Sequence, residues 1–407
     1  MAQATDKTDG PDKRPGVFIP DWLANPGGVA LLLAAAVVCL TLYTNLREVG
    51  QPFGGYVSYS LLGGRISMLS PETPDWWPVM AAGFVSGSDK LLTIDGLPYT
   101  ANARATFARA HAAGRPVIVG IERLATGALE SVTIWPTRIT FNDVVDVKLP
   151  ELLVAVAFWL LALLVLRAGP DIITNRVFAV AASLVAVHRA AAIPALIGDL
   201  RPPIFLLHAS LLIAAGLLGP LAMHLAIVFP TPLPRQPRRW LIVAYGVGLA
   251  SGVLLAATRH RWWASVPLEQ AQAADDAAYM TMLVLLLMGV VALFARLIWS
   301  WIYERRTRRQ RRAAGIVLVG MAGALPMLFY LIIPLLTDLD TVFVAHWRGL
   351  DVRYTLLAIP ITFAVVIIRY QAFQALSSLF MVVLLVALSG ALAAVGVWLW
   401  RVGGAGG

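Results

Sequence analysis

Residues 28–46 have the sequence GVALLLAAAVVCLTLYTNL, a predominantly apolar run without a charged side chain. A helix needs about 20 predominantly apolar residues to cross the hydrocarbon core of a bilayer. The run is therefore predicted to be a transmembrane helix, with Cys39 as a small apolar residue inside it. The tail before it is polar and shows no small-residue cleavage pattern, so we expect an uncleaved anchor rather than a signal peptide.

The composition of the whole chain agrees with this prediction. Of its 407 residues 59% are hydrophobic and 14% are charged, and the mean hydropathy is +0.75. Soluble globular proteins have about 25% charged residues. The composition excludes a soluble enzyme, a disordered chain and a coiled-coil rod. A single cysteine also excludes an internal disulfide framework and a multi-cysteine zinc site.

Further apolar runs divide the chain into a predicted membrane part and an inserted soluble segment. After residue 148 they lie at about 151–167, 177–197, 204–228, 240–257, 278–301, 314–336, 354–369 and 378–400. Together with the first run they predict about nine transmembrane helices. We therefore expect a polar tail at 1–25, an anchor helix at 26–46, a soluble domain at 47–148 and an eight-helix region at 149–407.

The distribution of basic residues predicts the orientation in the membrane. With the N-terminus in the cytoplasm, fifteen Lys and Arg residues fall in the short inside segments and six in the short outside segments, as the positive-inside rule requires. This bias accounts for the net charge of +9 without nucleic acid. The domain at 47–148 is then extracytoplasmic, and the localisation is the inner membrane.

One arginine cluster dominates the predicted cytoplasmic side. It either binds anionic lipid head groups or acts only as a topology anchor. Its members are Arg305, Arg306, Arg308, Arg309, Arg311 and Arg312. The pairs Trp76-Trp77 and Trp262-Trp263 are predicted to lie at the membrane interface.

Residues 89–135 have the alternation and turn residues of a small α+β domain. A strand at 89–94 enters a tight turn at Asp95-Gly96. The composition of residues 102–113 predicts a helix, and Gly114 is placed to end it. Two β-branched runs, 115–123 and 131–135, flank turn residues and predict a hairpin.

The order of these elements, together with the segments AAGF (81–84) and GSDKLLTIDG (87–96), resembles a bacterial PDZ domain. In that family a glycine-rich loop before the second strand offers backbone N–H groups to a peptide carboxylate. The matching loop is Phe53-Gly54-Gly55-Tyr56, although its pattern differs from the commoner alternation of glycine and hydrophobic residues. The loop either binds a peptide terminus or forms only a structural turn near the membrane.

Motifs outside the domain extend the resemblance over nearly the whole chain. They are QPFGGY (51–56), PETPDWWP (71–78), TFND (140–143), HLAIVFPTP (224–232), RRQRR (308–312) and IPITFAVVIIRY (359–370). In this order they resemble the N-terminal sensory region of bacterial multi-helix sensor histidine kinases with an extracytoplasmic PDZ-like domain, the layout of the competence kinase of bacilli. The kinase domains are missing after residue 369, so we expect either a sensory fragment or a stand-alone membrane module.

Searches for catalytic motifs favour a protein that is not an enzyme. The chain contains no HExxH zinc motif, no GxSxG elbow and no P-loop. His188 and Arg189 lie within a predicted span, where a charged residue is costly and usually faces protein or water. The pair is predicted either to form an intramembrane polar site or, for Arg189, to snorkel toward the interface. Haem ligation by His188 with His208 or His224 across helices is a less favoured alternative.

These observations predict a membrane sensor that captures a peptide or protein ligand outside and relays the signal by helix shifts. The alternative is a structural subunit whose PDZ-like domain docks permanently on a neighbouring membrane protein; a transporter is a third possibility. The predicted partners are membrane lipids, a peptide or protein C-terminus, and either another membrane protein or a cytoplasmic effector. No cofactor, metal or nucleic acid is expected.

Overall fold

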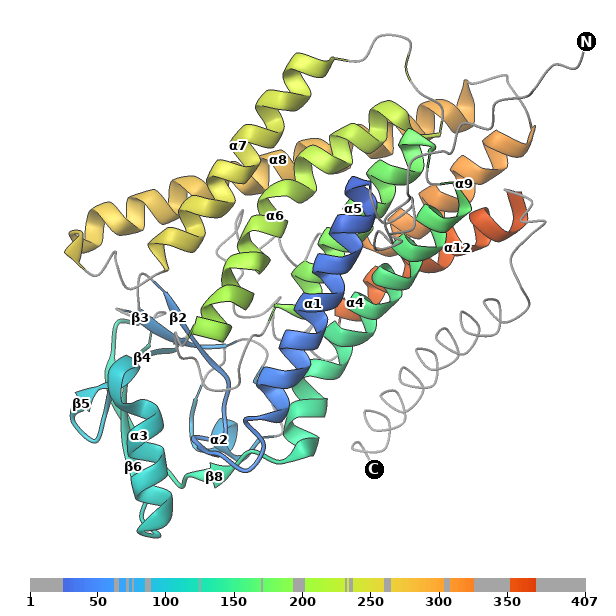
Figure 1. Ribbon diagram of the computed structural model, residues 1–407. Coiled ribbons are helices and arrows are strands. Elements are labelled where there is room, and N and C mark those ends of the chain that lie inside the picture. The colour runs from blue at the N-terminus through green and yellow to red at the C-terminus, as the bar shows by residue number, and fades with distance from the viewer. Residues whose placement is uncertain are drawn as a thin grey trace, which may run out of the picture.

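The computed structural model is mostly helical, with a small antiparallel sheet beside one end of the helices (Figure 1). The structure describes residues 25–61, 66–70, 73–74, 77–84, 89–123, 126–169, 171–192, 202–230, 233, 237–259, 265–303, 308–325 and 352–370.

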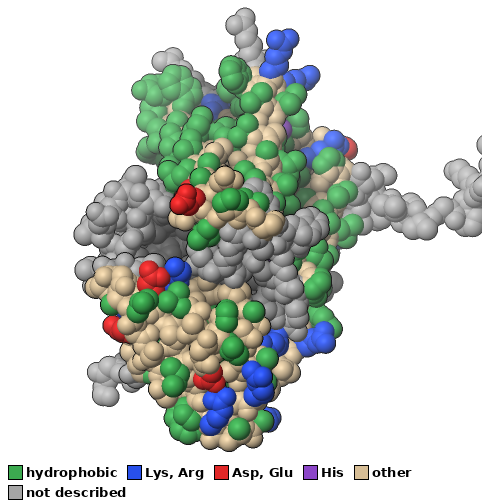
Figure 2. All heavy atoms as spheres, turned by 90° about the vertical axis from the view of Figure 1, so that its left-hand side faces the viewer, with side chains coloured by type: hydrophobic (Ala, Val, Ile, Leu, Met, Phe, Trp, Pro, Cys, Tyr) green, Lys and Arg blue, Asp and Glu red, His purple; other side chains and the backbone are tan. Residues whose placement is uncertain are grey.

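Five helices in this part of the chain are long and apolar enough to cross a membrane, which indicates a membrane-spanning protein. They are α1 (Pro26–Leu46), α4 (Phe141–Ala168), α6 (Pro202–Val228), α7 (Arg238–Thr258) and α8 (Leu268–Ile302). Figure 2 shows hydrophobic side chains gathered over the helical part, whereas the surface of the sheet domain is mixed and polar. The apolar helical surface suits contact with lipid.

Four further helices in the described part of the chain do not add to these five candidate spans. They are α5 (Ile173–Ala190), α9 (Arg308–Gly323), the 3-10 helix η3 (Val352–Leu357) and α12 (Ala358–Tyr370). None of the four is both long and apolar enough to join the five candidate spans. The spans predicted at 177–197 and 314–336 continue beyond the described residues, and the span at 378–400 lies wholly outside them, so the number nine stays a prediction.

The first helix begins at a conventional cap. The side chain of Asn25 accepts hydrogen bonds from the N–H groups of Gly27 and Gly28, at 2.9 and 3.1 Å, and Pro26 occupies the first helical position. Gly27 has no Cβ, which allows α1 to approach the Leu166 and Ala179 side chains of α4 and α5. These three helices share one apolar core.

Glycines also set the packing of α6, α7 and α8. A Cβ at Gly216 in α6 would collide with the backbone of Gly248 in α7, and one at Gly289 in α8 would collide with the backbone of Gly219 in α6. Close backbone approach at small residues is typical of helix packing in membranes, where lipid gives no hydrophobic drive for association.

The described part of the sheet domain contains eight strands, all paired antiparallel. A main sheet has the order β2-β3-β4-β6-β7, with β5 paired to β4, and β1 pairs separately with β8. The strands are β1 (Pro52–Phe53), β2 (Ser58–Leu61), β3 (Ile66–Leu69), β4 (Asp89–Ile94), β5 (Leu97–Pro98), β6 (Val117–Arg123), β7 (Leu129–Ile134) and β8 (Thr137–Arg138). Helix α2 spans Pro78–Ala81 and α3 spans Tyr99–Ala112.

Several local predictions in this domain are confirmed. The turn at Asp95-Gly96 has positive φ at both residues, +49° and +78°, as a tight hairpin turn requires. Gly114 ends α3 at φ +58°, and β6 pairs with β7 as the expected hairpin. The prediction for Trp77 was wrong. It is 6% exposed and belongs to the domain core, because tertiary packing places its ring edge-on to Phe53.

The domain core lies between the sheet and α3. Alternate residues of β6 and β7 point into it, as the side-chain period of two in a strand dictates. Its buried members include Leu69, Phe84, Leu91, Ile94, Phe107, Val117, Val119, Ile121, Val132 and Ile134.

Two connections join the domain to the helices, and they are tied together. Two hydrogen bonds extend the β1–β8 pair. The N–H of Gly50 donates to the carbonyl of Ile139 at 2.8 Å, and the N–H of Ile139 donates to the carbonyl of Gln51 at 2.9 Å. Helix α4 follows directly, with a capping box between Thr140 and Asp143. The chain therefore leaves and re-enters the helical part through one short ribbon.

The arginine bias predicts opposite sides of the membrane for the domain and for the end of α8. We expect a Leu129→Cys variant, in a Cys39→Ala background, to react with a membrane-impermeant thiol reagent in intact cells. A Tyr303→Cys variant should react only after permeabilisation, because Tyr303 adjoins the arginine cluster. Both side chains are exposed, at 74% and 61%. Labelling of position 303 but not 129 in intact cells would overturn the predicted orientation.

Candidate functional site

The loop Phe53-Gly54-Gly55-Tyr56 connects β1 to β2. Its two aromatic residues point into the domain and are only 3% and 2% exposed. The ring of Phe53 meets Trp77 edge-on at 5.7 Å between centroids, and the ring of Tyr56 stacks on Phe84 at 5.3 Å. These contacts anchor both ends of the loop and leave the two glycines between them.

The two glycines are needed for different reasons. A Cβ at Gly54 would collide with the rings of Tyr56 and Phe107, so the position has no room for a side chain. Gly55 has φ +75°, where other residues are strained, yet the nearest atom to its Cβ position would be the Thr137 hydroxyl at 3.9 Å. Gly54 is thus fixed by packing and Gly55 by backbone conformation.

The backbone of this loop has unused donors. Within the described part of the chain, the N–H groups of Gly54, Gly55 and Tyr56 make no hydrogen bond, whereas the next N–H, of Val57, donates to the Thr73 hydroxyl at 3.1 Å. Consecutive free N–H groups of this kind suit an anionic oxygen.

A row of hydroxyl groups lies beneath the loop at the start of α3. The hydroxyls of Tyr56 and Tyr99 are 2.8 Å apart, and those of Ser67 and Thr100 are also 2.8 Å apart. Burial raises the pKa of Tyr99 to about 12, and burial together with the nearby Tyr99 raises the pKa of Tyr56 well above 10. Both phenols are therefore neutral donors at physiological pH.

Strand β2 leads directly out of the loop and is an edge of the sheet. It pairs with β3 along Ser58–Leu61, and no other described strand lies on its far side. An edge strand presents alternate N–H and C=O groups that an added strand can pair with. The free donors of the loop and the open edge of β2 are therefore continuous.

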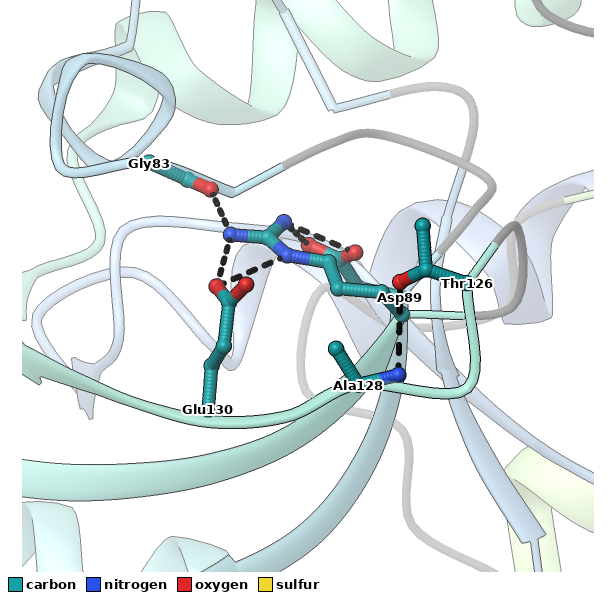
Figure 3. Close-up of polar contacts among 6 residues, drawn as sticks. Gly83, Asp89, Thr126, Ala128 and Glu130 are labelled. Carbon is teal, nitrogen blue, oxygen red and sulfur yellow. Dashed lines mark hydrogen bonds and ion pairs between the residues drawn. The ribbon is translucent and has the colours of Figure 1, made fainter.

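Arg123 ties strands β4 and β7 to the segment after α2 (Figure 3). Its guanidinium donates to both oxygens of Asp89, at 2.9 and 2.7 Å, to Glu130 at 2.8 Å and to the carbonyl of Gly83. Although partial burial opposes the charge, the bonds to Glu130 and Asp89 prevail and raise the pKa of Arg123 above its usual value. The side chain thus fixes the segment between α2 and β4 against the β6–β7 hairpin.

The structure places Arg189 in the protein interior. The residue is 7% exposed, its Nη1 lies 3.3 Å from Oε2 of Glu151 in α4, and its Nε donates to His188 Nδ1 at 3.3 Å. The side chain is therefore buried against protein groups, and an intramembrane polar site at this position stays a prediction. The sequence analysis missed Glu151 as its partner.

A second polar cluster, also missed, joins α6, α7 and α8. The Thr258 hydroxyl donates to Asp275 at 2.6 Å, and Arg259 contacts both Asp275, at 3.5 Å, and His208, at 3.3 Å. In addition, His224 bonds the Tyr245 hydroxyl at 3.0 Å. These histidines therefore have protein partners on neighbouring helices.

The arginine cluster is only partly described. Arg308 and Arg309 begin α9, and the side chains of Arg311 and Arg312 are exposed. Arg305 and Arg306 lie outside the described residues. An exposed basic group at a helix start suits both the lipid and the topology interpretations.

Comparisons with known proteins return no match: no protein family, no curated protein and no solved structure resembles the chain significantly. Among the described residues, no group of His, Cys, Asp and Glu side chains could hold a metal ion.

We expect removal of the Arg123 side chain to destabilise the domain strongly. In Arg123→Ala the carboxylate of Asp89, which is fully buried, would lose its counter-ion, a change that typically costs about 3–5 kcal/mol. Glu130→Ala, which removes a half-exposed partner, should cost about 1 kcal/mol or less. Urea unfolding of the full chain, followed by proteolysis at the β6–β7 turn, measures both; equal costs would contradict the role of the buried pair.

The buried tyrosines predict alkaline destabilisation. Because the folded pKa values of Tyr56 and Tyr99 exceed the unfolded value near 10, their contribution to stability is complete below pH 10 and is lost as the pH rises toward about 12. The free energy of unfolding of the domain should fall over this range, and fall less in Tyr56→Phe/Tyr99→Phe. Titration of tyrosinate absorbance alongside unfolding tests this; an identical decline in the double variant would contradict it.

Proposed function

We propose that this protein is a membrane-embedded sensor module that captures a peptide or protein C-terminus through a PDZ-like domain. The observation that carries the proposal is the continuity of the loop with the edge strand. Among the described residues, the N–H groups of residues 54–56 have no partner, and they are followed at once by β2, whose far side no described strand covers. A bound chain would place its carboxylate at the loop and add to the sheet as a further strand.

The arrangement of the domain supports the PDZ-like interpretation. The glycine loop precedes the second strand, as the sequence resemblance implies, and α3 begins beside the same loop with the Tyr56–Tyr99 bond. The apolar anchors Phe53 and Tyr56 keep the loop in shape whether or not a ligand is bound.

The relay part of the proposal rests on how the domain joins the helices. The β1–β8 ribbon connects α1 and α4 to the domain without a free linker, so a ligand that shifts the domain also shifts these helices. In the alternative, a structural subunit, the same loop and edge would be covered permanently by another membrane protein.

A peptide library screened against the detergent-solubilised full chain tests the proposal. Peptides with a free C-terminal carboxylate should be enriched over the same library with amidated termini. Gly55→Val should weaken the binding of a selected peptide about tenfold or more, because a β-branched residue at positive φ is strained by about 1–3 kcal/mol and distorts the loop.

The matched control is Gly127→Val. Gly127 also has positive φ, +67°, and no atom near its Cβ position, but it lies in the β6–β7 turn and not in the loop. It carries the same backbone strain without touching the loop, so peptide affinity should be unchanged. Equal binding of free and amidated peptides, or equal losses in the two variants, would show that the loop is a structural turn and would favour the docking subunit.

A further inference from the structure

Helix α4 takes part in two cores. Its Val144 and Val147 belong to the apolar core of the sheet domain, whereas Val154 and Ala155 belong to the core of the helix bundle. One continuous helix thus passes from the domain into the bundle beside α1 and α5 (Figure 1). Whatever moves its first two turns also moves the part packed in the bundle.

Two charged side chains of α4 are buried between these cores. Lys148 is 1% exposed and Glu151 is 3% exposed, and their spacing of three residues puts them on one side of the helix. Pro150 lies between them and has no N–H, so one bond of the helix ladder is missing there. The junction therefore depends more on side-chain contacts than a regular stretch of helix does.

Helix α1 brings polar groups to the same level. Gly27 of α1 lies against Leu166 of the antiparallel α4. Glu151 lies fifteen residues before Leu166 in α4. Because both helices rise about 1.5 Å per residue and run antiparallel, the residue of α1 at the level of Glu151 lies fifteen residues after Gly27, at position 42. From this level toward the sheet domain, four polar side chains of α1 and of the turn after it are buried. They follow one another at helical spacing and are Thr41, Thr44, Asn45 and Glu48.

Helix α5 supplies the remaining charge through the Arg189–Glu151 pair, whose side chains are 9% and 4% exposed. We call the buried charged residues Glu48, Lys148, Glu151 and Arg189 the junction cluster, in which Glu151 and Arg189 form the contacting pair. It contains two acids and two bases, so its formal charge is zero. It draws on the turn after α1 and on helices α4 and α5, and all three helices contribute to the core of the bundle.

Stability does not account for such a cluster. Replacing a buried ion pair by apolar side chains of similar volume is often neutral or stabilising, because desolvation offsets the attraction between the charges. Ionisable residues buried in a membrane protein usually mark a functional position. An ion pair between two helices, however, is either made or broken. It can therefore respond to a small shift of one helix against the other.

We propose that the junction cluster couples the sheet domain to the helix bundle. A displacement of the first turns of α4 changes the Glu151–Arg189 contact and so repositions α5 against α4. The cluster would carry the ligand signal of the proposed function, but its test needs no ligand, and so its outcome is independent of peptide binding. Glu151 and Arg189 are positioning residues in this scheme.

The decisive variant is Glu151→Met/Arg189→Met, which replaces the pair by apolar side chains and is expected to fold. Hydrogen exchange of the full chain in detergent, read by mass spectrometry, should show unchanged protection in the bundle segments of α4 and α5. Residues 141–147 and the β1–β8 ribbon should exchange about tenfold faster, because the contact that fixes the first turns of α4 against α5 is lost.

The control is Arg176→Met, which removes a solvent-exposed pair with Asp171 at the far end of α5 and should leave the domain unchanged. Arg189→Lys, which keeps the charge, should restore most of the protection that Arg189→Met alone loses. Unchanged or stronger protection of residues 141–147 and of the ribbon in the double Met variant would overturn the proposal and leave the pair a packing feature. Loss of protection throughout the bundle, with the domain unaffected, would also overturn it.

Discussion

The position of the sheet domain depends on one constraint, the continuity of α4. The helix starts at the Thr140–Asp143 capping box, immediately after the last strand, and runs for 28 residues through both apolar cores. Because β8 is paired to β1 and α4 follows after Ile139, the domain has little freedom to swing away from the helices. The rotation of α4 about its own axis therefore decides which side of the domain faces the bundle.

The domain combines this fixed attachment with an open edge. Its interior is closed by aromatic contacts around Tyr56 and by the bonds of Arg123 to Asp89 and Gly83. The opening is at the loop and β2, where backbone groups have no partner among the residues described. The domain is rigid inside, is attached through a helix and is open at one edge. Such a domain suits the capture of an extended chain whose binding is transmitted to the membrane helices.

The sequence predicted those features that depend on local pattern. Uninterrupted apolar runs located α1, α4, α6, α7 and α8, since a membrane helix is defined by length and composition. Asp95-Gly96 and Gly114 were recognisable because positive φ selects a few residue types. The loop at 53–56 was recognised by its glycines. The packing that requires a glycine at position 54 could not be recognised from the sequence pattern.

The predictions failed for residues whose environment is set by contacts with residues far away in the sequence. Trp77 follows another tryptophan and resembles an interfacial residue, but its ring packs on Phe53 in the domain core. Glu151 stands at the start of an apolar run, and its partner Arg189 comes 38 residues later on another helix. An isolated arginine in an apolar run indicates either a polar partner or snorkelling, and only the packing of α4 on α5 shows that Glu151 is its partner.

The distance between the domain and the bundle is the most direct test of this account. Spin labels at Leu129→Cys in β7 and Leu206→Cys in α6, in a Cys39→Ala background, occupy exposed positions in the two parts. Pulsed electron spin resonance should give one narrow distance distribution, because α4 and the β1–β8 ribbon hold the domain to the helices. A broad or multi-peaked distribution would show a domain that swings on a hinge, and would contradict the claim that one helix unites the two cores.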